Sequence, residues 1–432
     1  MKRGLSLLFL YFILLVPTAC KKQTRNAPPI APIPGDVELV NTSHLEQLTI
    51  PVTFQNGKTA EAVYIYSNAP NYNPAYADGE GFTCVDDVAR AAQFYFRSSK
   101  FSSDPAVKLK AYNLIRFIIN MQSDNGYFYN FLQTGNVINT NGITSLNQPR
   151  WWSWRALQAL TEAVSLIADA QLSMEVDQAI NKLIVRIKSD LVNIAKTTTT
   201  IKGITVPQWL PEGADAGATL ILALIPYSQK SGDAEIKEYI RKLADGIALM
   251  QLGDATRFPF SSFLSSGNIW HAYGSDQAHA LFQAGEFLND VNYTNKALAE
   301  VDNFYPWLLQ NGFKYSFEVE NLNNVLTAQN VKDFEQIAYG VRPMVFAAID
   351  AFELTKNEKY ADIAGHLAAW FTGNNIAGLA MYSSANGRCY DAINAGGAIN
   401  KNAGAESTIE ALLTMQRVNK YPAVKTALTR YK

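Results

Sequence analysis

Carboxylates gather at two places far apart in the chain, and their spacing suits acid–base chemistry. The first is Asp86-Asp87-Val88-Ala89-Arg90, and the second holds Glu406 and Glu410, one helical turn apart. Adjacent helical residues point in different directions, so one aspartate is expected to cap its helix while the other faces a pocket. A helix N-terminus and Arg90 favour an ionised carboxylate there. The simpler alternative is that both aspartates cap the helix and pair with Arg90.

Aromatic and cationic side chains gather in four further segments, at 149–155, 208–215, 271–279 and 336–343. Flat aromatic rings bind the apolar faces of sugars, and guanidinium groups bind hydroxyls or carboxylates. The candidate substrate-binding residues are Arg150, Trp151, Trp152, Trp209, Glu212, His271, Tyr273, Tyr339 and Arg342, together with Asp86, Arg90 and Asp391. Core packing, helix capping and local ion pairs are the alternative roles for these side chains.

Asp276 is the substitute candidate for a general acid or base. It shares a helix face with His279, but this spacing matches no strong zinc pattern, so no metal is expected. The chain also has no phosphate-binding loop, dinucleotide fingerprint, Gly-x-Ser-x-Gly motif or paired Cys-x-x-Cys motif. We therefore expect carboxylate chemistry without a cofactor.

A repeated pair of helices must position these residues. Apolar residues at helical spacing predict helices near 86–99, 105–122, 150–169, 173–196, 212–229, 233–251, 271–289, 293–309, 336–355, 358–372, 404–418 and 421–431. The first helix of each pair is rich in small residues and is expected in an inner ring, whereas the second has a polar face and is expected outside. A closed ring would place Glu406 near Asp87, where two carboxylates could act on a glycosidic bond.

The two acidic motifs carry a family resemblance. Asp86-Asp87-Val88-Ala89-Arg90 and Asn402-Ala403-Gly404-Ala405-Glu406-Ser407-Thr408 resemble the DD-x-AR and N-x-GAEST motifs of toroid proteins in the six-hairpin glycosidase superfamily. Similar domains are found beside bacterial glycosyltransferases. The resemblance covers most of residues 75–420 and implies an all-α (α/α)6 toroid that processes carbohydrate.

The expected function is hydrolysis of an oligosaccharide, with Asp87 and Glu406 as the acid/base pair. One alternative is a polysaccharide lyase, with Tyr273 or His271 as base and Arg150 or Arg342 neutralising a uronate. A second is a glycan-binding lipoprotein without catalysis, and a third is a structural or assembly protein that binds no glycan.

The N-terminus has the pattern of an export signal. Lys2-Arg3 precedes an apolar stretch from Leu5 to Val16, and Val16-Pro17-Thr18-Ala19-Cys20 resembles a bacterial lipoprotein processing site. The alternative is a secretory signal cut nearby. We expect an exported chain that is anchored to a bacterial membrane through Cys20 and faces the periplasm. Its divisions are residues 1–20 as signal, 21–40 as tether, 41–75 as a β-hairpin segment around Asn56-Gly57, and 76–432 as toroid.

Composition excludes some partners. The chain has 48% hydrophobic and 17% charged residues and a formal net charge of −1, which gives no field for nucleic acid or an anionic membrane surface. We expect a monomer that touches the membrane only through its anchor. Cys84 and Cys389 precede the first and last inner helices, so they form either a ring-closing disulfide or two buried free thiols.

The lipid anchor depends on one side chain. Replacing Cys20→Ser should move the protein from the membrane fraction to the soluble fraction and leave the helical circular dichroism spectrum unchanged, because only the acylated thiol is lost. Continued membrane association of the variant would contradict lipidation at this residue.

Overall fold

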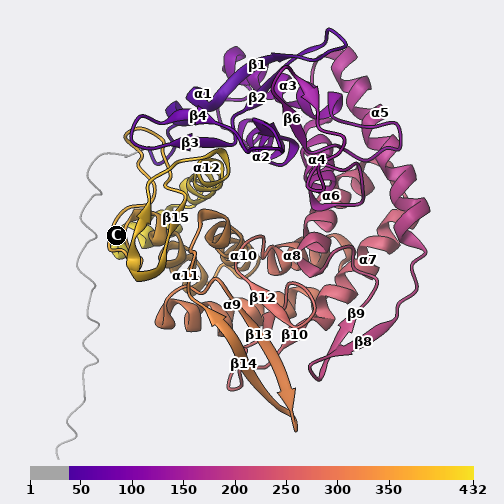
Figure 1. The fold of residues 1–432 in the computed structure, drawn as a ribbon. Helices are drawn as coiled ribbons and strands as arrows, with labels where there is room; N and C mark the ends of the chain where they lie inside the picture. Colours follow the sequence, from indigo (N-terminus) through magenta and orange to yellow (C-terminus); the bar gives the residue numbers. More distant parts are fainter. Residues whose placement is uncertain (1–37) are drawn as a thin grey trace, which may run out of the picture. The chain divides into compact units, whose positions relative to one another are not determined.

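Six helical hairpins form a closed ring in the computed structural model, which describes residues 38–432 (Figure 1). The inner helices are α2 (Val85–Phe96), α4 (Trp151–Ala163), α6 (Ala214–Ser231), α8 (Gln277–Leu288), α10 (Ala338–Thr355) and α12 (Ala405–Asn419). The outer helices are α3 (Pro105–Asn120), α5 (Ala170–Ile187), α7 (Ala234–Leu249), α9 (Val291–Asn311), α11 (Glu358–Ala368) and α13 (Pro422–Tyr431). Each expected helical range overlaps one of them. Helix α2 packs on both α4 and α12, which closes the ring.

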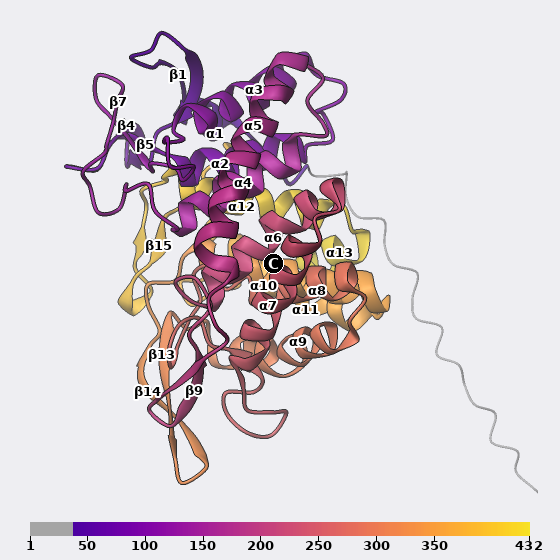
Figure 2. The same cartoon turned by 90° about the vertical axis from the view of Figure 1, so that its right-hand side faces the viewer.

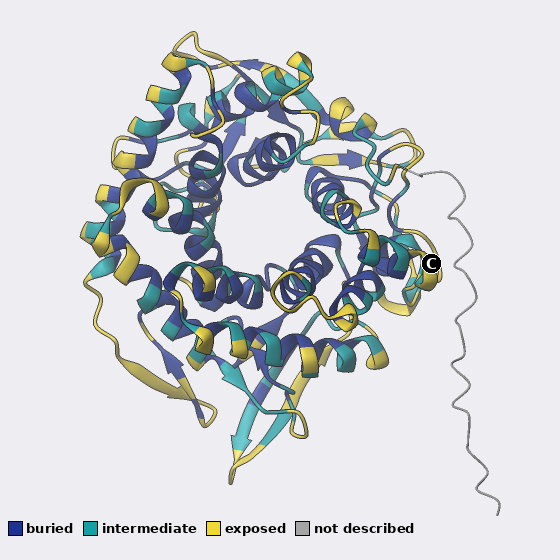
Figure 3. Ribbon diagram, turned by 180° about the vertical axis from the view of Figure 1, so that it is seen from behind, coloured by how far each residue is buried: buried dark blue, intermediate teal, exposed yellow. Residues whose placement is uncertain are grey.

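The inner helices are buried on all sides because small residues let them pack closely. Every residue of α2 is buried, as is α10 from Ala338 to Ala351, and the inner ring is mostly dark blue in Figure 3. The outer helices are amphipathic: α7 buries Ile236, Ile240 and Leu243 and exposes charged residues. This burial pattern agrees with the assignment of small-residue helices to the inner ring.

The two helix classes begin differently. In five outer helices, the side chain of the N-cap residue accepts a hydrogen bond from a backbone N–H of the first turn. These N-cap residues are Asp104, Asp169, Asp233, Asp290 and Asn357. Five inner helices have no side-chain cap, and α2 is capped by the Cys84 sulfur. Neither Asp87 nor Asp276 caps its helix. The acidic residues at the inner helix starts therefore remain available for other contacts.

Short antiparallel strands lie before the inner helices, in the segment that precedes α2 and in the long connections from outer to inner helices. They are β5 (Thr83–Cys84), β6 (Phe131–Gln133), β7 (Val137–Ile138), β8 (Thr198–Ile201), β9 (Ile204–Pro207), β10 (Gln251–Leu252), β11 (Ser262–Phe263), β12 (Ile269–His271), β13 (Ser316–Leu322), β14 (Val325–Lys332), β15 (Ala392–Ile393) and β16 (Ile399–Asn400). Labelled strands of these connections gather at one end of the ring (Figure 2). This end holds the starts of the inner helices.

The hairpin expected around Asn56-Gly57 consists of β1 (Thr49–Thr53) and β2 (Thr59–Val63), and residues Ser43–Leu48 before it form helix α1. A second hairpin follows, β3 (Tyr66–Asn68) with β4 (Asn73–Ala75). Helix α8 begins at Gln277 instead of residue 271, because Ile269–His271 pairs with β13.

The export signal, Cys20 and residues up to 37 lie outside the described residues. Within residues 38–432, no helix combines the length and apolarity needed to cross a membrane. Cys84 and Cys389 are buried free thiols and form no disulfide, which is the second of the two alternatives for this pair.

Gly365 provides a test of how tightly the outer helices pack. A Cβ atom there would lie 2.6 Å from the Leu428 backbone nitrogen of α13 and would also strike the Ala427 side chain. Gly365→Ala should therefore lower the free energy of unfolding by about 1–3 kcal/mol, measured by urea denaturation. Gly217→Ala is the control, since its Cβ would meet only the Leu210 and Ile247 side chains. Equal stability of both variants would contradict this packing.

Candidate active site

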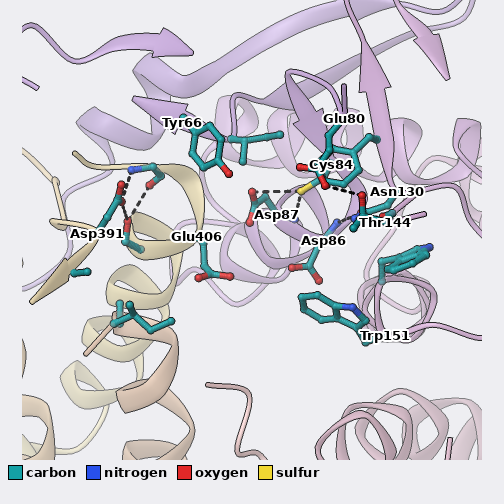
Figure 4. A pocket seen from close by; sticks show the side chains of 18 of the residues that line it. Tyr66, Glu80, Cys84, Asp86, Asp87, Asn130, Thr144, Trp151, Asp391 and Glu406 are labelled. Carbon is teal, nitrogen blue, oxygen red and sulfur yellow. Dashed lines mark hydrogen bonds between the residues drawn. The ribbon is translucent and has the colours of Figure 1, made fainter. Parts of the chain in front are cut away.

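A cavity of about 470 Å³ opens where the inner helices begin (Figure 4). Its lining includes Tyr66, Glu80, Cys84, Asp86, Asp87, Asn130, Thr144, Trp151, Trp152, Glu335, Asp391, Glu406 and Ser407. We call it the acidic cavity. Helices α2 and α12 supply its central carboxylates, as ring closure requires, so residues more than 300 positions apart in sequence share one site.

Arg90 holds the centre of the site. Its side chain is 1% exposed and forms ion pairs with four carboxylates: Asp86 (2.8 Å), Asp87 (2.9 Å), Glu406 (3.2 Å) and Glu410 (3.0 Å). Two of these acids come from its own helix and two from α12. Burial alone would lower the pKa of Arg90, but the surrounding carboxylates raise it well above its ordinary value, so the cation is permanent.

Arg155 continues this layer on α4. Its Nε lies 2.6 Å from Asp86, its Nη2 donates to the Tyr339 hydroxyl, and its guanidinium lies 4.9 Å from the centre of the Tyr339 ring. A space of about 20 Å³, room for roughly one water, lies among Arg90, Arg155, Arg342 and their neighbours. The layer therefore forms a floor beneath the acidic cavity.

Arg342 completes the floor. It donates two hydrogen bonds of 2.8 Å to the Asp276 carboxylate and pairs through Nε with Glu410, which is fully buried. Burial would raise the pKa of Asp276, yet Arg342 brings it below its ordinary range. Asp276, the substitute candidate for a general acid or base, does not line the acidic cavity, because the bidentate pair with Arg342 fixes its carboxylate within the floor.

Two carboxyls of the acidic cavity titrate near neutrality. Burial raises the pKa of Glu406 to about 7, with Arg90 opposing and Asp87 adding to the shift. Burial likewise raises the pKa of Asp87 to about 6, against the pull of Arg90. The Glu406 side chain is 40% exposed to the cavity, whereas that of Asp87 is only 4% exposed. Glu406 is thus the more accessible proton donor.

Cys84 fixes the orientation of Asp87. Its thiol lies 3.4 Å from Asp87 Oδ2 and its sulfur accepts the Asp87 backbone N–H. Burial raises the pKa of the Cys84 thiol well above its ordinary value, with the adjacent carboxylates adding to the effect. The thiol therefore stays protonated and can donate to the carboxylate.

A second cavity of about 280 Å³ lies beyond Trp151, which lines both spaces. His271 Nδ1 lies 2.8 Å from the Tyr273 carbonyl, which can only accept, so this nitrogen carries the proton. His271 Nε2 then faces Asp215 at 3.5 Å as a free base. Burial lowers the pKa of His271 to about 4 and raises that of Asp215 to about 7. We call this space the histidine cavity.

The candidate residues divide among these places. The acidic cavity takes Asp86, Asp87, Trp151, Trp152, Asp391 and Glu406; the histidine cavity takes Trp151, Glu212, His271, Tyr273 and Tyr339; and the floor takes Arg90, Asp276 and Arg342. Arg150 pairs with Glu212, whose carboxylate also accepts the Trp151 backbone N–H. Trp209 lines neither cavity, because its buried indole donates to the Lys242 carbonyl.

Sequence reasoning missed several contributors. Tyr66, Glu80 and Glu335 reach the acidic cavity from the connections that precede α2 and α10. The segment Gly79-Glu80-Gly81 could have indicated that Glu80 lies in a closely packed connection, because the two glycines allow a close approach to neighbouring backbone. The Cβ of residue 81 would indeed meet the Leu132 backbone.

No protein-family model and no curated protein sequence matches the chain. Solved structures do match. The cellobiose 2-epimerase of Bacillus thermoamylovorans has a TM-score of 0.60 at 14% identity, over 89% of this chain and 97% of that one. A sugar epimerase from a ruminal bacterium has a TM-score of 0.57 at 13% identity, over 82% and 91% of the two chains. A D-mannose isomerase has a TM-score of 0.56 at 14% identity, over 83% and 91%.

These similarities establish the fold. It is a mainly helical (α/α)6 toroid with small antiparallel hairpins, the fold of the two epimerases and the isomerase named above.

Proposed function

We propose that this protein is a glycoside hydrolase that cleaves an oligosaccharide in the acidic cavity, with Glu406 as general acid and Asp87 as base or nucleophile. One observation carries the proposal. Two carboxyls that titrate near neutral pH share Arg90 at the base of a cavity bordered by an indole ring. Such a pair can protonate a leaving oxygen and attack, or activate water, at the anomeric carbon.

Glu406 suits the acid role because its side chain is exposed to the cavity and its pKa is raised to about 7. A large fraction of Glu406 is therefore protonated at neutral pH, and its proton can pass to the glycosidic oxygen as the C–O bond breaks. Once deprotonated, the carboxylate lies 3.2 Å from Arg90, which stabilises its charge until a proton returns.

Asp87 suits the second role because its pKa of about 6 leaves it mostly ionised at neutral pH. Arg90 and Cys84 hold its carboxylate from two sides, which fixes the oxygen atoms before substrate arrives. Asp86 is tied to both Arg90 and Arg155 and takes a positioning role in this scheme.

Trp151 is proposed as the sugar platform. Its ring is partly exposed and borders both cavities, and the Glu212 carboxylate holds its backbone N–H at 2.9 Å. A sugar stacked on this indole would extend into both spaces, which suits an oligosaccharide.

Export and lipid anchoring at Cys20 belong to the same proposal. The support is the basic Lys2-Arg3 pair, the apolar stretch after it, and the processing-site pattern that ends at Cys20. An anchored hydrolase with a tether would meet glycans outside the cytoplasm.

Sugar epimerisation or isomerisation is the second candidate, and the histidine cavity favours it. The free Nε2 of His271 could remove a proton from the carbon next to a sugar carbonyl and return it, while Asp215 exchanges a proton with the carbonyl oxygen. The fold similarity to sugar epimerases and an isomerase is compatible with this chemistry.

The lyase alternative has less support. It needs a cation free to neutralise a uronate, but Arg342 is engaged by Asp276 and Glu410, and Arg150 is engaged by Glu212. A glycan-binding lipoprotein without catalysis would keep Trp151 and tolerate loss of the carboxylates.

Substitution of the two acids tests the hydrolase. Purified wild-type protein is screened on a glycan panel, and cleavage is measured as new reducing ends. Glu406→Gln and Asp87→Asn should each lower kcat by about 10²–10⁴-fold, because each removes one proton-transfer or nucleophilic step. The control is Glu238→Gln, an exposed outer-helix acid whose loss should leave turnover unchanged. Thermal unfolding by circular dichroism verifies that the variants are folded.

Wild-type turnover in both acid variants would overturn the assignment. A product of unchanged mass with altered configuration, lost in His271→Ala but kept in Glu406→Gln, would establish the epimerase candidate instead. Binding without any product would establish the non-catalytic alternative.

The pH profile provides a separate check. Asp87 must be ionised and Glu406 protonated, so kcat/KM should fall below pH about 6 and above pH about 7. With an aryl glycoside, whose leaving group needs no proton, Glu406→Gln should retain activity and lose the alkaline fall. An alkaline limb that persists in this variant would exclude Glu406 as the acid.

A further inference from the structure

The acidic cavity has an unusual charge distribution. Its lining contains six carboxyl groups, from Glu80, Asp86, Asp87, Glu335, Asp391 and Glu406, and contains no lysine, arginine or histidine. Asp215 and Glu212 add acid groups in the adjoining histidine cavity, where His271 is neutral. A ligand in the mouth therefore meets negative charge from several directions.

The nearby arginines do not offset this charge for a ligand. Arg90, Arg155 and Arg342 are nearly fully buried, with exposed side-chain fractions of 1%, 6% and 7%. Each is already paired with carboxylates of the floor, and none lines the acidic cavity. Displacing such a pair would leave a buried carboxylate without a partner, which is strongly unfavourable. Uronates, sulfated sugars and phosphorylated sugars thus find no free cation here.

Three acids at the rim are free of ion pairs within the described residues. Glu80 accepts a hydrogen bond from the Thr144 hydroxyl at 2.6 Å, and Asp391 accepts one from the Gly404 backbone at 2.8 Å. Glu335 is exposed and has no hydrogen bond or ion pair. Glu80 and Asp391 lie on opposite sides of the cavity, with Asp86, Asp87 and Glu406 between them (Figure 4). These oxygens can accept bonds from a cation.

Two aromatic rings add a second, independent feature. Tyr66 is 45% exposed and Trp151 is partly exposed, and both border the acidic cavity. Aromatic faces bind sugar rings, and they also attract ammonium groups through their π electrons. Acids around a sugar-sized space with aromatic walls favour a sugar that carries a positive charge.

Building on the proposed function, we infer that the substrate is an aminoglycan with free amino groups, so that an unacetylated amino sugar occupies the acidic cavity. The ammonium group would donate charge-assisted hydrogen bonds to rim carboxylates such as Glu335 or Glu80. An acetylated nitrogen has no charge and would lose these bonds.

The test compares ligands that differ only in charge. Calorimetry on the wild-type mature chain measures binding of glucosamine and galactosamine, of oligomers of each, of the N-acetylated partner of every ligand, and of glucuronate. Each amine should bind about tenfold more tightly than its acetylated partner, a difference of about 1.4 kcal/mol, because a charge-assisted hydrogen bond is stronger than that of a neutral amide. Raising sodium chloride from about 0.05 to about 0.5 M should weaken binding of the amines only.

Charge variants at the rim locate the contact. Glu335→Gln and Glu80→Gln should each weaken amine binding several-fold and leave binding of the acetylated partners unchanged, because shape is kept and charge is lost. Glu238→Gln, on the outer ring, is the matched control. Equal affinity of amines and acetylated partners throughout the panel, or preference for glucuronate, would overturn the inference.

The outcomes separate the two proposals. Selective binding of amino sugars without cleavage of their oligomers would retain the substrate class and remove the hydrolase. Cleavage of a neutral glycan that depends on Glu406, with no preference for amines, would retain the hydrolase and remove the amino-sugar substrate class.

Discussion

The ring depends on how one buried cation is neutralised. Arg90 has lost nearly all contact with water, and an isolated guanidinium in such a place would cost several kcal/mol. Its partners are supplied in equal number by α2, near the start of the toroid, and α12, near its end. The same ion pairs therefore join the first inner helix to the last and assemble the carboxylates of the candidate site. The contacts that close the ring are thus the contacts that build the candidate site.

The floor contains more acidic than basic side chains, and this excess affects which of the acids keep their protons. Arg90, Arg155 and Arg342 face Asp86, Asp87, Asp276, Glu406 and Glu410. Asp276 accepts two hydrogen bonds from Arg342 and stays ionised. Burial raises the pKa of Asp87 to about 6 and that of Glu406 to about 7, and Arg90, which is shared among four acids, offsets this effect only in part. Groups that titrate near the working pH are those that acid–base catalysis requires. Because the buried layer has fewer arginines than acids, two of its acids can exchange protons near neutral pH.

Much of the ring could be predicted because its causes are local. Small residues mark the inner helices, and residues such as Asp104 and Asp233 cap the outer ones. The proximity of Asp87 and Glu406 followed from closure of a repeat. The places of Asp276 and Trp209 could not be predicted in this way. Each lies at or just before the start of an inner helix, as the cavity residues do, so position in the sequence does not separate them. Only the three-dimensional partners decide that Arg342 holds the first and the Lys242 carbonyl the second. His271 was assigned to a helix because its pairing partner, β13, lies more than 40 residues later.

The floor also determines how a polymer could move. Arg90 and Arg155 both lie against the Tyr339 ring, and Arg342 joins Asp276 to Glu410. Side chains of five inner helices therefore meet across the ring, which is a cup and not a tube. Under the proposed function, a sugar chain would have to enter and leave by the same opening, so it could not be threaded through and cut in successive steps along its length. Each encounter would act on the portion that fits the cup, and the product would have to diffuse out before the next chain entered.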